Sequence, residues 1–295
     1  MLKGGFCLAG DLHCHTRLSL GSMGIDDLIM LAKKRGVATI AITDQDCQAG
    51  TIRGKVIGER HGVSVIPGVE ISCTDPGSGR EVHMLCYLSD SPDRLEGLCH
   101  ANLAARKKAA QYMLLKFVQR FPVEPALVHE CARGSTCVYP QHMMRALMES
   151  GLTDQIHSDV YHELFTPESP RNILRQARFP SPLEVLEAIH QSGGIAVLAH
   201  PAENGASDLL EDLVRAGLDG VEVFHSANSR DEQKQLLALA KAENMLVTGG
   251  SDFRGMYGVG CVTVGHEQVN DAQVSSLLSY KSRMNRAKRQ QAAAV

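Results

Sequence analysis

The sequence predicts an α/β protein in which strands and helices alternate around a parallel sheet. Two observations predict this class, the alternation of apolar runs with helix-like segments and the length of the chain. Short apolar runs recur along the chain, each followed by a helix-like segment, and this alternation stops in the middle of the chain. With 295 residues, the chain is long enough for one large α/β barrel, or for a core domain that carries a smaller inserted one.

The predicted strands are short and apolar, and helix-like segments separate them. The first strand ends in the polar cluster "DLHCHT". Later runs such as "GVATIAITD" and "GGIAVLAHP" are typical of the strands of βα units. We place these later runs at residues 36–44, 62–70, 193–201, 218–225 and 244–252.

The alternation stops between about residues 92 and 180. The stretch "DRLEGLCHANLAARKKAAQYMLLKFVQRF" has the spacing of a long amphipathic helix. Prolines then divide the segment that follows into shorter helices, because proline cannot continue a helix interior; they are Pro122, Pro140, Pro167 and Pro170. We expect a barrel formed by residues 1–91 and 181–295, with a helical insertion, residues 92–180, that covers its active-site face.

Composition and charge exclude several classes of protein. The formal net charge of -3 gives no general attraction to nucleic acid or anionic membranes. No apolar run is long enough to span a bilayer, and the start "MLKGGFCLAG" is a poor signal peptide. Nine cysteines occur without a CxxC pair, which indicates reduced, buried thiols rather than a zinc-thiolate site. We expect a cytoplasmic protein that binds neither membranes nor stable duplex nucleic acid.

The stretch "AGDLHCHTRLSLG" places Asp11, His13 and His15 at alternate positions after an apolar run. Alternate side chains of a strand share one face, so three polar, proton-binding groups would lie together. Such crowding is unfavourable unless something organises it, and the simplest organiser is a metal ion.

Other polar residues stand at the ends of the later apolar runs. In α/β barrels the carboxyl ends of the strands carry the active site, because the βα loops converge there. Imidazole and carboxylate ligands without thiolate suit Zn, Mn or Fe, and one shared carboxylate would allow two ions to lie close together. The residues at these ends are Asp44, Glu70, His200, His225 and Asp252.

The blocks "DLHCHT", "ITDQD", "GVEIS", "EVHMLCYL", "LAHP" and "GGSDFRG", in this order, resemble the motifs of the PHP family of metal-dependent phosphoesterases, named after polymerases and histidinol phosphatases. The resemblance runs from about residue 10 to residue 265 and implies a distorted (β/α)7 TIM-like barrel. It implies that Glu70 bridges two divalent ions. The first ion would be bound by His13, His15, Glu70 and Asp252, and the second by Glu70, His83 and His200. Asp11 and Asp44 would accept hydrogen bonds that orient the ligand imidazoles.

Three departures from the family pattern concern one corner of the site. The family usually has an acidic residue at the position of Leu20 and histidines at the positions of Gln45 and Arg254, all serving a third metal. We therefore expect two divalent ions, of Mn, Zn or Fe, and no third. Arg254 would either clamp the substrate phosphate, as a guanidinium can do bidentately, or pair with Asp46 or another nearby carboxylate.

The resemblance implies hydrolysis of phosphate mono- or diesters by a metal-bridged hydroxide that attacks phosphorus. The substrate would be a small phosphorylated metabolite, a nucleotide or a short oligonucleotide. We expect Glu70, Asp252 and His225 to take part in catalysis, and His225 is one candidate to protonate the leaving group. The residues expected to bind substrate are Arg254, Arg17, Gln45 and His142, the last in the segment "TCVYPQHMM".

Two other functions stay open at this point. A PHP-like module that has lost part of its metal centre could bind a phosphorylated ligand or a protein partner without catalysis, as the residues Leu20, Gln45 and Arg254 allow. An amidohydrolase-like barrel also begins with HxH. It normally requires a carboxylated lysine between its metals, and no predicted strand ends in lysine.

Overall fold

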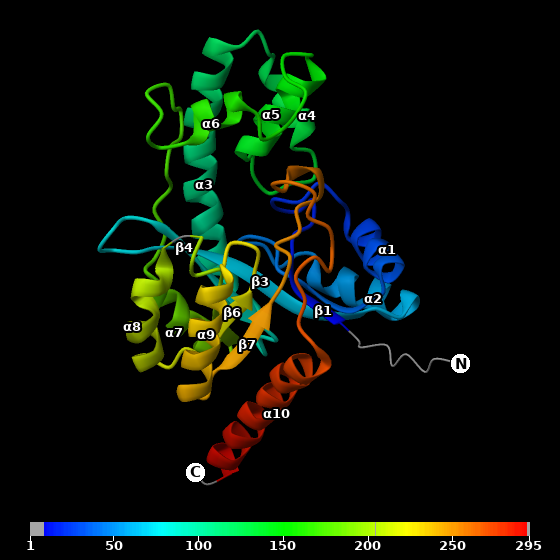
Figure 1. The fold of residues 1–295 in the computed structure, drawn as a ribbon, viewed down its shortest axis with the longest axis vertical. Coiled ribbons are helices and arrows are strands. Elements are labelled where there is room, and N and C mark those ends of the chain that lie inside the picture. Colours follow the sequence, from blue (N-terminus) through cyan, green and yellow to red (C-terminus); the bar gives the residue numbers. More distant parts are fainter. Residues whose placement is uncertain (1–8, 204, 294–295) are drawn as a thin grey trace.

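The computed structural model describes residues 9–203 and 205–293. The first eight residues, which belong to the start that we expected to be a poor signal peptide, lie outside it. Its centre is a seven-stranded sheet in which the strands follow one another in chain order (Figure 1). The strands are β1 (Ala9–Cys14), β2 (Val37–Ile42), β3 (Ser64–Thr74), β4 (Glu81–Tyr87), β5 (Ile195–Leu198), β6 (Gly220–Phe224) and β7 (Leu246–Gly249).

The sheet is mixed, so the prediction of a parallel sheet is wrong at one strand. β4 is antiparallel to both β3 and β5, whereas the other neighbouring strands pair in parallel. Only residues 75–80 join β3 to β4, and a parallel pair would need a crossover of a dozen or more residues. The hairpin places Glu70 of β3 and His83 of β4 close together, because Ser72 pairs with His83 across it.

The sheet curls until its two ends approach each other. The backbone N–H of Phe253 donates to the carbonyl of His13, and that of His15 donates to the carbonyl of Phe253. Gly250 permits this approach, since a Cβ there would lie 2.3 Å from the backbone nitrogen of His13. A regular ladder between β1 and β7 is absent from the described residues, so the arrangement is a curled mixed sheet rather than a closed barrel.

Helices that connect the strands pack around this sheet. Several begin with capping residues: Ser181 and Glu184 form a reciprocal capping box, and Ser229 and Glu232 form another. The helices are α1 (Ile25–Arg35), α2 (Thr51–His61), α7 (Pro182–Gln191), α8 (Leu210–Arg215), α9 (Arg230–Ala242) and α10 (Asp271–Ala293), with short 3₁₀ turns at Ala206–Leu209 and Gly255–Tyr257.

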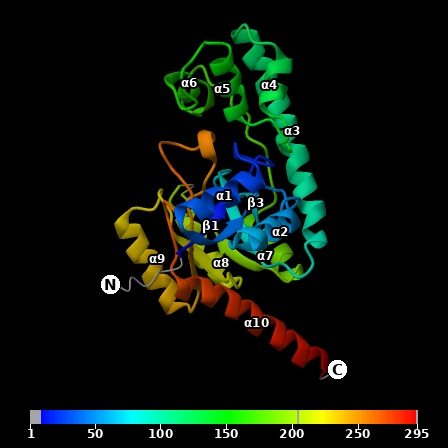
Figure 2. The ribbon, with the colours of Figure 1, turned by 90° about the vertical axis from the view of Figure 1, so that its right-hand side faces the viewer.

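The middle of the chain forms a helical group that stands at one end of the sheet, opposite α10 (Figures 1 and 2). It comprises α3 (Asp93–Arg120), α4 (Pro125–Cys131), α5 (Pro140–Glu149) and α6 (Asp159–Phe165). This group has its own apolar core, to which Leu20 and Tyr257 contribute from loops at the strand ends. It therefore packs against the loops that follow β1 and β7.

The helices and the cysteines bear on two classes of protein that the sequence excluded, membrane proteins and zinc-thiolate proteins. Within residues 9–203 and 205–293, no helix is both long enough and apolar enough to cross a membrane. The cysteines described there are free thiols and most are buried, but Cys261, which we expected to be buried, is exposed. Cys7 lies outside the described residues.

Candidate metal centre

Glu70 is the centre of the candidate site. It lies on β3, its side chain is fully buried, and its Oε1 atom is close to three imidazoles. The distances from Oε1 are 3.1 Å to Nε2 of His200, 3.2 Å to Nδ1 of His83 and 3.4 Å to Nε2 of His13. Burial raises the pKa of Glu70, but the three imidazoles hold it well below its usual value, so Glu70 is ionised.

The other two predicted ligands complete the group. Nε2 of His15 lies 3.5 Å from Oε2 of Glu70 and 3.0 Å from Oδ1 of Asp252. Nε2 of His13 is 3.9 Å from the same Asp252 oxygen. The structure thus brings together all six residues that the sequence predicted as metal ligands, although their positions span more than two hundred residues of the chain.

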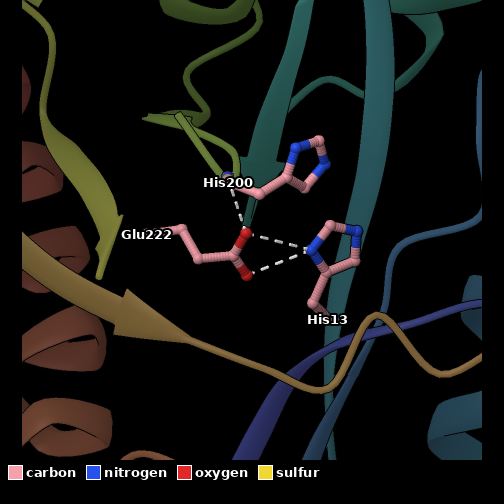
Figure 3. A group of neighbouring side chains, drawn as sticks. All are labelled: His13, His200 and Glu222. Atoms are coloured by element: carbon pink, nitrogen blue, oxygen red, sulfur yellow. Dashed lines mark hydrogen bonds and ion pairs between the residues drawn. The ribbon is translucent and has the colours of Figure 1, made fainter. Parts of the chain in front are cut away.

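Glu222, which we did not predict, fixes the ring of His13. It is fully buried in β6, and its Oε1 atom lies 3.0 Å from Nδ1 of His13, while Oε2 accepts from the backbone N–H of His200 at 2.9 Å (Figure 3). Such a contact to one ring nitrogen turns the other toward the metal side. The available signal was a carboxylate inside the apolar run "GVEVF".

His15 is fixed through a hydroxyl. Its Nδ1 atom lies 3.2 Å from Oγ of Ser19, and that hydroxyl donates to Asp44 at 2.6 Å. Asp44 therefore orients an imidazole indirectly, as the resemblance implied. The same expectation is wrong for Asp11, whose carboxylate accepts from backbone N–H groups, including that of Ser251 at 2.9 Å. Asp11 joins the two ends of the sheet and contacts no ligand ring.

His83 is fixed by a chain of side chains that reaches the helical group. Its Nε2 atom lies 3.1 Å from Oε1 of Glu81, and Nη2 of Arg106, on α3, donates to the same oxygen at 2.9 Å. Arg106 also donates to Ser72 and pairs with Asp46 at 3.5 Å. Although burial raises the pKa of Glu81, Arg106 and His83 lower it to about 2, so the carboxylate stays ionised. The sequence offered no signal for this contact between distant segments.

Several buried polar atoms in the site have no hydrogen-bond partner. Buried polar atoms are normally paired, so a group of unpaired ones that converge requires an explanation. Apart from Oε1 of Gln45, an amide oxygen, the unpaired atoms around Glu70 are imidazole nitrogens or carboxylate oxygens, the donor set that divalent Zn, Mn or Fe prefers over alkali ions. The residues present therefore fit divalent metal ions. These imidazole and carboxylate atoms are Nε2 of His13, His15 and His225, Nδ1 of His200 and Oε2 of Glu70.

Two of the predicted ligands have unusual backbone conformations. His200 follows β5 with a φ of 22°, and Asp252 follows β7 with a φ of 46°. Non-glycine residues adopt such positive φ values only when the surroundings enforce them, and these conformations concentrate at functional sites. Both turns direct a donor side chain toward Glu70, at the price of local strain.

The corner expected to lack a third metal contains other contacts. Leu20 is buried in the core of the helical group. Gln45 is buried, and its side-chain nitrogen lies 3.2 Å from Nε2 of His83. Arg254 pairs bidentately with Asp252, at 2.9 Å from Nε to Oδ1 and 2.5 Å from Nη2 to Oδ2. The carboxylate that Arg254 pairs with is thus Asp252 and not Asp46.

The remaining predicted residues differ in how far they are buried. His225 is buried beside the ligands; its Nδ1 accepts from the N–H of Ala227, and its Nε2 is 3.9 Å from Oδ2 of Asp252. Arg17 is exposed and donates to the carbonyl of Ser22.

His142 lies in the core of the helical group. Its Nδ1 accepts from the N–H of Tyr139, and burial lowers its pKa to about 4. Among the described residues, neither His142 nor Arg17 contacts a predicted ligand.

Comparisons with known proteins show the family of this chain. The model of one family, the PHP domain, matches residues 11–142. The chain is 33% identical to the phosphoribosyl 1,2-cyclic phosphate 1,2-diphosphodiesterase of Eggerthella lenta, over 84% of this chain and 95% of that protein. It is 27% identical to a 5'-3' exoribonuclease of Haemophilus influenzae, over 82% of this chain and 89% of that protein. A crystal structure from Bifidobacterium adolescentis, provisionally named a metal-dependent phosphoesterase, is 29% identical with a TM-score of 0.83, over 92% of this chain and 95% of that one.

Proposed function

Because the chain belongs to the PHP domain family, we propose that it is a metal-dependent hydrolase of phosphate esters. The observation that carries the proposal is the convergence of unpaired imidazole and carboxylate atoms around Glu70. The relatives named above act on a cyclic phosphate diester and on RNA, which are both phosphate esters. An amidohydrolase function has less support, because none of the strands in the described residues ends in lysine.

Two divalent ions would occupy the centre. His13, His15, Glu70 and Asp252 would hold the first, and Glu70, His83 and His200 the second. Two donor groups support this division, because His13, His15 and Glu70 form one, Glu70, His83 and His200 form another, and both contain Glu70. Asp252 is grouped instead with Glu203 and His225, and its link to the first ion's ligands is its 3.0 Å contact with His15. Mn, Zn and Fe all suit these ligands, and a third ion is not expected because Leu20, Gln45 and Arg254 offer no anionic or imidazole donor.

The bound ions would supply Lewis acidity and lower the pKa of water. The side chains of this protein would contribute orientation and proton transfer. Glu222 and Ser19 hold the rings of His13 and His15, so the metal-side nitrogens stay directed at Glu70 without reorganisation during the reaction. His225 Nε2 is buried without a hydrogen-bond partner and could hold the proton that the leaving oxygen needs.

Arg254, which pairs with Asp252 in this structure, would bind a non-bridging phosphate oxygen of the substrate. The side chain of Arg254 is 19% exposed, which leaves it within reach of a substrate. Because it is permanently charged, it would provide part of the positive charge that a third ion would supply. Gln45, beside His83, would offer its amide nitrogen to the same substrate, while Arg17 would act from the rim of the site.

The substrate is a small phosphorylated metabolite, a nucleotide or a short oligonucleotide. Residues 92–180 form the insertion in this proposal, and the rest of the chain forms the metal-binding α/β core that it covers. His142 would act from inside that insertion by supporting Tyr257, whose ring lies 5.3 Å from its own. We expect the reaction to take place in the cytoplasm.

A test uses bis(p-nitrophenyl) phosphate and p-nitrophenyl phosphate with added Mn²⁺. Wild-type protein is expected to hydrolyse at least one of them, while Glu70→Gln, which removes the shared ligand, is expected to be inactive. The second candidate function, a module that binds a phosphorylated ligand without catalysis, is favoured by the Arg254–Asp252 ion pair, which occupies one predicted ligand. Inactivity on both esters with two ions demonstrably bound would support the module and refute hydrolysis.

A further inference from the structure

A basic groove lies on the flank of the molecule, beside α3. It has a volume of about 930 Å³ and is bounded by the β3–β4 turn, by one face of α3 and by the segment between α6 and α7. Figure 1 shows this turn projecting next to α3, with the segment after α6 passing down beside it. The groove is separate from the buried centre around Glu70, and none of the predicted metal ligands lines it.

Three of the residues that line the groove are cationic and have no carboxylate partner among the described residues. Lys108, Arg175 and Arg178 line it, and none of its lining residues is acidic. In the part of the chain that the structure describes, these three cations form no ion pair with a carboxylate, in contrast to Arg171 nearby, which pairs with Glu163. Because the whole chain is weakly anionic, the positive charge of the groove is a local feature rather than a general one.

An exposed aromatic ring lies in the same wall. Tyr112 is 45% exposed, and two cations flank its ring: the guanidinium of Arg175 at 5.8 Å and the ammonium of Lys116 at 5.9 Å from the centroid. A cationic groove with an exposed aromatic ring is the combination that binds single-stranded nucleic acid, since the cations contact phosphates and the ring stacks with a base.

The groove lies within reach of the metal centre. Gly79 lines it and precedes His83 by four residues on the hairpin, a path of about 13 Å at strand geometry. About four stacked nucleotides of a single strand span that distance. A mononucleotide in the centre would not reach the groove, whereas a longer strand would.

We propose that the groove lined by Lys108, Tyr112, Arg175 and Arg178 binds the body of a single-stranded oligonucleotide whose scissile phosphate lies at the metal centre. This deepens the proposed function and rests on it. The groove would select for substrate length, because it adds contacts only for strands that extend past the centre. A small phosphate ester would be hydrolysed without using it.

The test compares two triple variants that each lose the same charge. Lys108→Ala, Arg175→Ala and Arg178→Ala remove the cations of the groove. The control, Lys34→Ala, Lys55→Ala and Arg60→Ala, removes three exposed cations of α1 and α2 that form no ion pair among the described residues. Binding is measured by fluorescence anisotropy in chelator, so that no cleavage occurs, with a labelled 5'-phosphorylated RNA of about eight nucleotides.

The expected result is a smaller salt dependence in the groove variant only. Each lost phosphate contact reduces the slope of log K against log salt by about 0.7, so three reduce it by about 2. Between 50 and 200 mM salt, wild type would then lose about 20-fold more affinity than the groove variant. Tyr112→Ala should weaken binding by about 5- to 150-fold, while Tyr112→Phe, which keeps the ring, should not. Affinity should rise once the strand exceeds about four nucleotides, the length that spans the distance from the metal centre to the groove, and should level off when the groove is filled.

The two proposals fail in different ways. If the groove variant binds RNA like wild type, or loses no more than the control, the groove proposal is overturned even if small esters are hydrolysed. If inorganic polyphosphate binds as tightly as RNA and Tyr112→Ala has no effect, the groove is not a nucleic-acid site. If wild type binds RNA with the expected slope but hydrolyses no phosphate ester, the groove stands and the proposed hydrolysis fails.

Discussion

Glu222→Gln tests whether a carboxylate that touches no metal controls the metal centre. The two oxygens of Glu222 serve two donors, the ring Nδ1–H of His13 and the backbone N–H of His200. Glutamine has one oxygen and one NH₂ group, so whichever way the amide turns, one of these buried donors would face another donor.

Two quantities should change in the Glu222→Gln variant, the free energy of unfolding and the metal affinity. A buried donor without an acceptor costs about 1–3 kcal/mol, which sets the expected loss in free energy of unfolding for the metal-free variant. A metal-binding histidine that loses the carboxylate behind it typically loses about 10- to 100-fold in metal affinity. The loss should fall mainly on the ion held by His13, because His83 keeps its own carboxylate, Glu81.

Urea unfolding in chelator measures the first magnitude, and competition with a coloured chelator for Mn²⁺ or Zn²⁺ measures the second. Glu187→Gln is the matched control, since it makes the same chemical change on the exposed face of α7. If Glu222→Gln binds both ions as tightly as wild type, Glu222 does not control the metal centre. Equal weakening of both ions would refute the claim that each histidine has its own orienting partner.

Three further predictions follow from contacts in the same site. In metal-free protein, burial lowers but neighbouring carboxylates raise the pKa of His83 to about 10, and that of His13 well above 6.5. Because the pKa of each histidine is higher in the folded than in the unfolded protein, its protonation stabilises the fold fully below pH 6.5, and this stabilisation is lost as the pH rises toward 10. The free energy of unfolding in chelator should therefore fall across this pH range; a rising profile would contradict this. Arg254→Met frees Asp252, so calorimetric titration with Mn²⁺ should show binding tighter by about tenfold, with a raised KM for the phosphate ester; unchanged affinity would show that the ion pair does not compete with metal. Arg106→Met releases the carboxylate behind His83, so chelator competition should show weaker binding of the second ion by about 10-fold or more; weakening of the first ion alone would place the effect elsewhere.

Most of the ligand set could be predicted because its members end apolar runs of the sequence. His13 lies near the end of β1, and His200 and Asp252 lie within three residues after β5 and β7, where the carboxyl ends of the curled strands converge. Glu70 ends an apolar run of the sequence but lies inside β3, which continues to Thr74. The other strands lie at the predicted apolar runs, but β4 was not among the predicted strands. His83 was carried by family resemblance rather than by pattern.

The parts that sequence could not supply depend on contacts between distant segments. Glu222 alternates with valines in β6, so nothing in that run distinguishes a buried carboxylate from a solvent-facing one. Arg106 lies on a long helix among other cations, and only the packing of α3 against β4 shows that it reaches Glu81. The direction of β4 was hidden for a related reason, because a short apolar run gives no indication of which way its neighbour runs.

Anomalous scattering from crystals grown with Mn²⁺ tests the central claim most directly, because it counts the ions and places them. Two peaks are expected, one on each side of the Glu70 carboxylate. Density for no ion among these donors, or for a third ion in the corner formed by Leu20, Gln45 and Arg254, would contradict the account.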